Sequence, residues 1–174
     1  SYQNSSFRLS MSYNSPYCGK KDVRTKTVKL IFKRSELLYD CAQLGYVHGD
    51  TMQTDDEHAK HQVMDIVEDG NVDRVTRVLN LVMSEIREVL YPYTKTEAED
   101  GDSRVDTLTE VEEYTVSLLV PDAFSSTTQT YLENLIHELL VDRVMADWCS
   151  ITYPEKEDVW KLKAAEALRS INKA

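Results

Sequence analysis

The stretch that most constrains the fold is residues 131–151, YLENLIHELLVDRVMADWCSI, because its apolar residues cover most of a helix surface. At 3.6 residues per turn these apolar side chains fall into two stripes. One stripe contains Leu132, Leu135, Ile136, Leu139 and Leu140, and the other contains Val141, Val144 and Trp148. A helix that is apolar on two sides must be covered on both, so we predict that it is the central helix of the fold.

Two charged residues, Arg143 and Asp147, fall on the first of these stripes, four residues apart and therefore on consecutive turns. Burying a lone charge is costly, so each needs the other or a partner from a neighbouring chain. We therefore predict a partly buried ion pair between Arg143 and Asp147. Its role is either structural, within one chain, or a contact across a subunit interface, where Arg is enriched.

Alternating apolar and polar residues predict two strands. Residues 27–32, TVKLIF, and residues 111–120, VEEYTVSLLV, each place a row of apolar side chains on one face. The two strands can pair with each other. Two strands alone are only marginally stable, so they must pack on helices or be extended by another chain.

Helical spacing of apolar residues predicts four further helices, over residues 35–44, 56–69, 71–91 and 154–173. The clearest is residues 71–91, which carries its apolar residues on one arc and ends before Pro92. The expected fold is therefore mainly α with a small β element. It is a helical bundle of four to five helices plus a two-stranded antiparallel sheet or hairpin.

Capping and breaking residues set the predicted bounds of these helices. Ser35 can cap the first, and Gly45 and Gly49 interrupt its pattern. Gly70 stops the second helix. Asn71 then caps the third, so we expect a break between these two helices.

Two polar segments flank or interrupt the predicted single domain of residues 26–174. Residues 1–25 are expected to form an extended arm, which is either a disordered leader or a segment that orders on a neighbouring subunit. Its aromatic anchors are predicted interface residues: Tyr2, Phe7, Tyr13 and Tyr17. Residues 94–107 contain five acidic residues and are expected to form an acidic loop.

The net charge of −10 would repel a phosphate backbone, so sequence-specific binding of nucleic acid is not expected. No apolar run approaches the ~20 residues that span a bilayer, and we expect neither a membrane span nor an export signal. Cys18, Cys41 and Cys149 have no paired spacing, which is typical of a reducing compartment.

The only residues that resemble a metal-ligand pattern are His58 and His61, three apart on a predicted helix among acidic residues. A solvated helix start explains them equally well, and no third ligand is evident. His137 stands alone on the central helix, where we expect it to be packed or hydrogen-bonded. The sequence contains no recognised catalytic motif, and we predict no catalytic, cofactor or metal site and no enzymatic activity.

Three segments, VKLIFKRSELLYD, EHAKHQVMDIVEDGNVDRVTRVLNLVMSEIREVLYPYT and IHELLVDRVMADWCSITYPEKEDVWKLKAAEALRSI, resemble small structural proteins of tailed bacteriophages and prophages. The layout is most similar to head-to-tail connector, or neck adaptor, proteins. This resemblance covers roughly residues 26–172. It implies a helical bundle with a small strand element that assembles into a ring, usually twelvefold, between the portal and the tail.

The resemblance implies a virion protein of the neck that lines the DNA conduit and contacts the portal and tail proteins after assembly in the bacterial cytoplasm. Portal-side adaptor, stopper and tail-terminator positions all remain open. Two other classes are also open. One is a cytoplasmic protein-interaction or regulatory module, and the other is a metal-dependent enzyme that uses His58 and His61.

Overall fold

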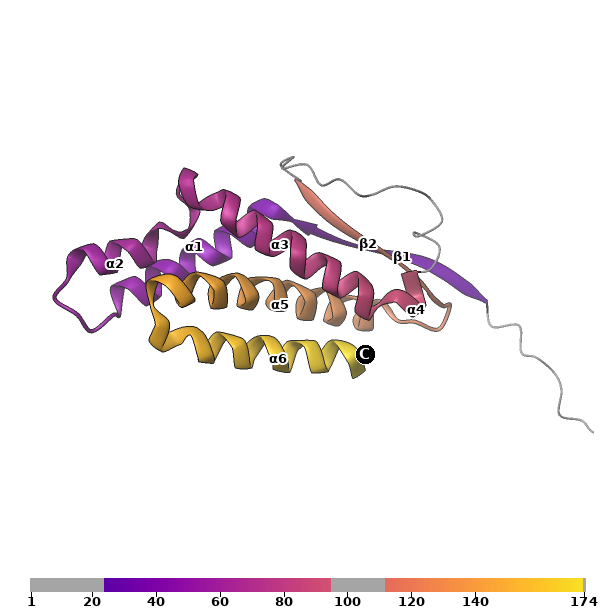
Figure 1. Cartoon of the computed structure of the whole chain (residues 1–174). Helices are drawn as coiled ribbons and strands as arrows, with labels where there is room; N and C mark the ends of the chain where they lie inside the picture. The colour runs from indigo at the N-terminus through magenta and orange to yellow at the C-terminus, as the bar shows by residue number, and fades with distance from the viewer. Residues whose placement is uncertain (1–23, 95–111, 174) are drawn as a thin grey trace, which may run out of the picture.

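The computed structural model describes residues 24–94 and 112–173, which form a mainly helical fold with one small sheet (Figure 1). The predicted fold class is confirmed. In chain order the elements are β1 (Thr25–Lys33), α1 (Arg34–Asp50), α2 (Glu57–Met64), the 3-10 helix η1 (Asp65–Val67), α3 (Asp69–Val89), α4 (Tyr91–Thr94), β2 (Glu113–Pro121), α5 (Ser126–Thr152), the 3-10 helix η2 (Pro154–Lys156) and α6 (Glu157–Lys173).

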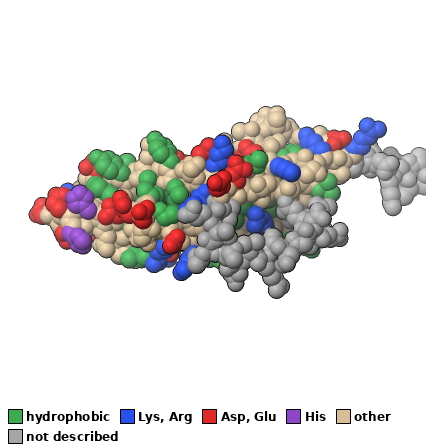
Figure 2. All heavy atoms as spheres, turned by 90° about the horizontal axis from the view of Figure 1, so that it is seen from above, with side chains coloured by type: hydrophobic (Ala, Val, Ile, Leu, Met, Phe, Trp, Pro, Cys, Tyr) green, Lys and Arg blue, Asp and Glu red, His purple; other side chains and the backbone are tan. Residues whose placement is uncertain are grey.

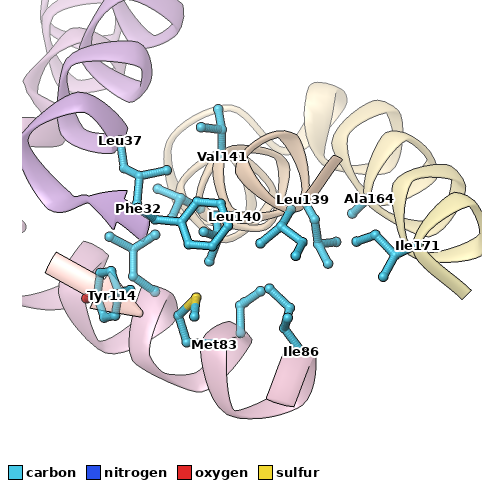
Figure 3. Close-up of a cluster of buried hydrophobic side chains, with 14 of the residues drawn as sticks. Phe32, Leu37, Met83, Ile86, Tyr114, Leu139, Leu140, Val141, Ala164 and Ile171 are labelled. Atoms are coloured by element: carbon cyan, nitrogen blue, oxygen red, sulfur yellow. The ribbon is translucent and has the colours of Figure 1, made fainter. Parts of the chain in front are cut away.

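Helix α5 is the central helix, as predicted. Both of its apolar stripes are buried apart from Leu135, which is partly buried against the core. Helices α3 and α6 run along different sides of α5, and α1 packs on it as well (Figure 1). Figure 3 shows side chains from α3, α6 and both strands converging around Leu139 and Leu140 of α5. The helix is covered on several sides because its own sequence is apolar on several sides.

Strands β1 and β2 pair antiparallel, in the register that places Val28 opposite Leu118 and Leu30 opposite Val116. One face of this sheet is buried against the helices. Its buried side chains are Val28, Leu30, Phe32, Tyr114, Val116, Leu118 and Val120. These are the alternating apolar residues by which the strands were predicted, so burial of one face accounts for the pattern.

The predicted break at Gly45 and Gly49 is wrong, because both glycines lie inside α1. They allow close packing against the next elements. A Cβ atom at Gly45 would lie 3.0 Å from Ile66 Cγ2, and one at Gly49 would lie 2.6 Å from Met64 Cγ and 2.8 Å from the Lys60 carbonyl oxygen. Their value to the fold is therefore their small size rather than an ability to end a helix.

The predicted caps of two helices are also wrong. Lys33, rather than Ser35, precedes α1, and Glu68, rather than Asn71, precedes α3. Gly70 lies in the first turn of α3 and therefore does not end a helix. The break between η1 and α3 is at Glu68, whose backbone is extended. The Asn71 side chain instead donates to the Asp65 carbonyl oxygen at 2.8 Å and ties α3 to η1.

Among the described residues, no helix is long and apolar enough to cross a membrane. The predicted arm lies outside the described residues except for its last two positions, and Thr25 is already the first residue of β1. Residues 95–111, which contain nearly all of the predicted acidic loop, also lie outside them.

Candidate assembly surface

The backbone groups of β1 point alternately toward β2 and away from it. Two hydrogen bonds just beyond the strands establish which residues point inward. Arg34 N donates to the Glu112 carbonyl oxygen at 3.0 Å, and Asp122 N donates to the Arg24 carbonyl oxygen at 2.9 Å. Both bonds continue the register of the two strands. Because hydrogen-bonded and non-hydrogen-bonded pairs alternate in an antiparallel ladder, the even-numbered residues of β1 bond to β2.

The odd-numbered residues of β1 therefore direct their N–H and C=O groups away from the sheet. We call this row the outer edge of β1: Thr25, Thr27, Lys29, Ile31 and Lys33. The Lys33 carbonyl oxygen, at the cap of α1, belongs to the first turn of that helix. No partner for the other backbone groups of this row lies in the part of the chain that the structure describes. The side chains of the same residues are exposed. An unpaired edge of this length can pair with a strand of another chain.

The other edge of the sheet, along β2, is obstructed. The same alternation turns the Thr115 carbonyl oxygen outward, and Arg87 Nη2 of α3 donates to it at 3.0 Å. Pro121, at the end of the strand, has no N–H to offer. Helix α4 also packs beside β2. The outer edge of β1 is therefore the more accessible of the two edges.

The outer edge is basic, with one apolar residue between its two lysines. Lys29 lies opposite Ser117 and Lys33 lies opposite Glu113, so only Lys33 faces an acidic residue across its own sheet. Ile31, between the two lysines, is 51% exposed. Lysine on an edge strand prevents indiscriminate pairing, because an incoming strand must compensate its charge.

The predicted ion pair between Arg143 and Asp147 is wrong, because each residue pairs with α3 instead. Arg143 donates to the Glu85 carboxylate through Nη1 at 2.7 Å and through Nη2 at 3.1 Å. Asp147 accepts from Arg74 Nε at 2.8 Å and from its Nη2 at 3.2 Å. Since the later residue of α3 contacts the earlier residue of α5, the two helices run antiparallel.

These two bonded pairs satisfy Arg143 and Asp147 within one chain, so neither residue needs a neighbouring subunit. The hydrogen bond to Asp147 raises the pKa of Arg74. All four side chains stay partly exposed, and a contact of this row with another subunit remains a prediction. The aromatic anchors of the arm lie outside the described residues, and their role also remains a prediction: Tyr2, Phe7, Tyr13 and Tyr17.

His58 and His61 are exposed on the first turns of α2. Asp56 caps this helix by accepting from His58 N at 3.0 Å and from Ala59 N at 3.3 Å. Within residues 24–94 and 112–173, no three His, Cys, Asp or Glu side chains are arranged to hold a metal ion.

His137 is hydrogen-bonded, as expected, with Nε2 2.6 Å from Asp40 Oδ2. Cys41 and Cys149 are buried and free, which also agrees with the sequence. Burial raises the pKa of Cys41 to about 12 and that of Cys149 to about 11. Both thiols are therefore protonated and poorly reactive at neutral pH.

Sequence reasoning missed Asp142, which is only 4% exposed. It lies in a groove of about 420 Å³ that α1 and α6 form over α5. Burial raises the pKa of Asp142 to about 6, with a further contribution from Glu138, and Lys163 of α6 opposes the shift. No sequence signal marked this residue, because an acid between two apolar stripes looks the same whether it is exposed or covered by a neighbouring helix.

Sequence reasoning also missed which edge of the sheet is open, although Lys26, Lys29 and Lys33 on one strand are a signal of an edge. Figure 2 shows acidic and basic side chains interspersed on one face of the molecule rather than gathered into a broad basic patch. No family model, curated protein or solved structure matches this chain.

Proposed function

We propose that this protein is a structural subunit of a phage particle that forms an oligomeric ring between the portal or capsid and the tail and lines the DNA conduit. The observation that carries the proposal is the outer edge of β1. Five consecutive outward-pointing residues of a strand that lies on the core offer backbone donors and acceptors to another chain. The phage setting comes from the sequence resemblance.

A contact at this edge suits a ring-forming subunit. The edge belongs to a strand whose other face is anchored by Leu30 and Phe32, 0% and 3% exposed, so it is held rigidly by the core. A rigid edge loses little conformational entropy when a strand is added. The other strand among the described residues, β2, is obstructed, so one subunit would receive a neighbour at β1 and offer a different surface to the next neighbour.

Charge is consistent with a DNA conduit. The net charge of −10 and the mixed surface favour passage of DNA without tight binding, since binding to DNA needs several Lys or Arg side chains on phosphates. We place the aromatic arm in the same assembly, where its anchors contact an adjacent subunit. Deleting residues 1–22 is expected to leave the domain folded and to weaken assembly.

The proposal is tested by blocking the outer edge of β1 without disturbing the ladder. Lys29→Pro removes an outward N–H, whereas Lys29→Thr removes the same side chain and keeps that N–H. Sedimentation and negative-stain imaging should show rings for the parent chain and for Lys29→Thr, alone or with portal and tail components. Lys29→Pro should keep a cooperative melting transition and remain monomeric.

A parent chain that stays monomeric alone and alongside capsid and tail components would rule out the ring function. If such a monomer instead bound one cytoplasmic bacterial protein with a stoichiometry of one to one, it would be an interaction module. Rings that form equally well with Lys29→Pro would remove β1 from the assembly mechanism.

A further inference from the structure

We infer that the outer edge of β1 receives residues 106–110 of a second copy of this chain, DTLTE, as an added strand. This inference deepens the proposed ring function and rests on it, because it names the segment that a neighbouring subunit supplies. Residues 106–110 lie outside the described residues.

Pairing of β1 with β1 of a second copy is disfavoured by charge. In the antiparallel arrangement with the greatest overlap, Lys29 of one copy lies opposite Lys29 of the other. Moving the centre of this pairing by one residue places Lys29 opposite Ile31 and diagonal to both Lys29 and Lys33 of the other copy, and moving it by two residues places Lys29 opposite Lys33 twice. Like charges directly opposite each other on neighbouring strands are destabilising. The occupant of this edge is therefore a different segment.

Strand β2 of a second copy is also a poor occupant. Its outward Thr115 carbonyl oxygen is already bonded to Arg87, and Pro121 cannot donate. A strand pair built on β2 would lack these groups unless α3 and α4 moved. The incoming strand must therefore come from outside the described sheet.

The outer edge specifies the composition of its partner. Lys29, Ile31 and Lys33 point to the same exposed face at intervals of two residues. The residues opposite them on an added strand would also be two apart. Charge and apolar complementarity then require an acidic residue, an apolar residue and an acidic residue at alternate positions. Because this order reads the same in both directions, it holds for a parallel or an antiparallel strand.

The chain contains this pattern, with Asp or Glu at the first and fifth positions and an apolar residue at the third, four times. Three of the occurrences are already part of helical structure: residues 36–40 in α1, residues 65–69 across η1 and α3, and residues 138–142 in α5. The fourth is Asp106, Leu108 and Glu110. Threonine occupies both intervening positions, and threonine favours strands.

The segment must come from a second copy, because its own chain cannot reach. Glu112 already lies in line with β2, because its carbonyl oxygen accepts from Arg34 N at 3.0 Å. Residue 110 precedes Glu112 by two residues, which span about 7 Å at most. The outer edge lies two strand spacings from β2, about 9.6 Å, with β1 in between. The contact is therefore between different surfaces of two subunits, and contacts of this kind form a ring when the rotation between subunits closes.

A charge-swap experiment tests the pairing in the full chain. One variant carries Lys29→Glu and Lys33→Glu, and the other carries Asp106→Lys and Glu110→Lys. Each alone should fail to form rings, and an equimolar mixture should form them, because each edge then meets a strand of opposite charge. A control with Glu97→Lys and Glu99→Lys makes the same change of charge outside the pattern and should assemble like the parent chain.

A labelled peptide of residues 103–112 measures the same contact without relying on ring formation. It should bind the parent chain and lose about tenfold or more in affinity for the variant with Lys29→Glu and Lys33→Glu, since two attractive cross-strand pairs become repulsive. A peptide with lysine at positions 106 and 110 should show the opposite preference. Lys29→Pro should bind neither peptide.

The results separate this inference from the proposed function. Rings that are lost in Lys29→Pro but are indifferent to both charge reversals would keep the ring function and overturn the choice of residues 106–110. If peptide binding follows the charge swap in a chain that forms no ring, the pairing is supported and the ring function is ruled out. A peptide that binds all variants equally would refute the pairing itself.

Discussion

The guanidinium of Arg143 lies 2.7 Å from the carboxylate of Glu85, 58 residues earlier in the chain, although Asp147 stands only one turn away on the same helix. Helix α3 brings Glu85 to one end of this row and Arg74 to the other. A bidentate contact between a guanidinium and a carboxylate has better geometry than two side chains of one helix achieve. The two cross-helix pairs therefore also set how α3 lies along α5.

The coupling between Glu85 and Arg143 should be measurable but small. Their side chains are 43% and 32% exposed, so solvent screens the pair. A double-mutant cycle with Glu85→Gln and Arg143→Met, measured by urea unfolding, should give a coupling free energy of about 0.5–1 kcal/mol. This coupling should be smaller in 1 M salt. The same cycle with Asp147→Asn in place of Glu85→Gln should give a smaller coupling free energy, because Arg143 does not pair with Asp147. A larger coupling between Arg143 and Asp147 would contradict the observed pairing.

The packing of α3 against α5 predicts that a buried acid unfolds the domain. Val82 is 0% exposed and Leu139 is 2% exposed. Val82→Asp or Leu139→Asp should abolish the cooperative melting transition, because an unpaired buried carboxylate costs several kcal/mol of a total stability of about 5–15 kcal/mol. The neighbouring Leu81 is 58% exposed, so Leu81→Asp is the matched control and should melt like the parent chain. A normal melt for Val82→Asp would mean that the core is assigned wrongly.

The glycines of α1 and α3 should respond to alanine with opposite signs. Gly49→Ala places a Cβ atom 2.6 Å from Met64 Cγ and 2.8 Å from a backbone oxygen, so it should destabilise the protein by about 1–3 kcal/mol. Gly70→Ala meets nothing within 4 Å and should stabilise α3 by about 0.5–1 kcal/mol. Chemical denaturation measures both changes. Equal effects at the two positions would show that the close approach of α1 to α2 is not needed.

Asp142 should make the domain less stable as the pH rises through its titration. Its pKa is about 6 in the fold and 3.8 in the reference state, so the folded state holds a proton that the unfolded state has lost between these values. The free energy of unfolding therefore falls from about pH 4 to pH 6, by on the order of 3 kcal/mol for these two pKa values. Above pH 6 the destabilisation is fully present.

Comparing the parent chain with Asp142→Asn isolates this contribution. The difference in unfolding free energy between the two proteins should change across pH 4–6 and stay constant from pH 7 to 8. Glu138→Gln should reduce the change, because Glu138 adds to the pKa shift of Asp142. Identical pH profiles for the parent chain and Asp142→Asn would show that water reaches this carboxyl group in the groove between α1 and α6.

Residue patterns were sufficient to predict the two strands and the five longer helices with their inward faces, but not α4 or the two 3-10 helices. The stripes of α5 and the alternation of Val28, Leu30 and Phe32 are buried as expected, since burial selects apolar side chains at the spacing of the element. The bounds were less predictable. Ser35 and Asn71 have favourable capping side chains, yet Lys33 and Glu68 precede the helices because the chain is already extended there.

The candidate surface was only half visible in the sequence. The shortage of strands was apparent, and it pointed to completion by another chain. Which edge is open was not apparent, because it depends on the register between β1 and β2 and on Arg87, which reaches the Thr115 carbonyl oxygen from α3. Once the register between β1 and β2 is known, the residues around Ile31 predict the composition of a partner strand.

The sequence by itself determined the fold class, the central position of α5 and the buried face of each strand, because each of these depends on the periodicity of one segment. Only the tertiary structure decided the partners of Arg143 and Asp147, the helical state of Gly45 and Gly49, and the burial of Asp142. Each of these depends on which element lies alongside. That neighbour comes from a distant part of the chain, and no local pattern encodes its distance or its charge.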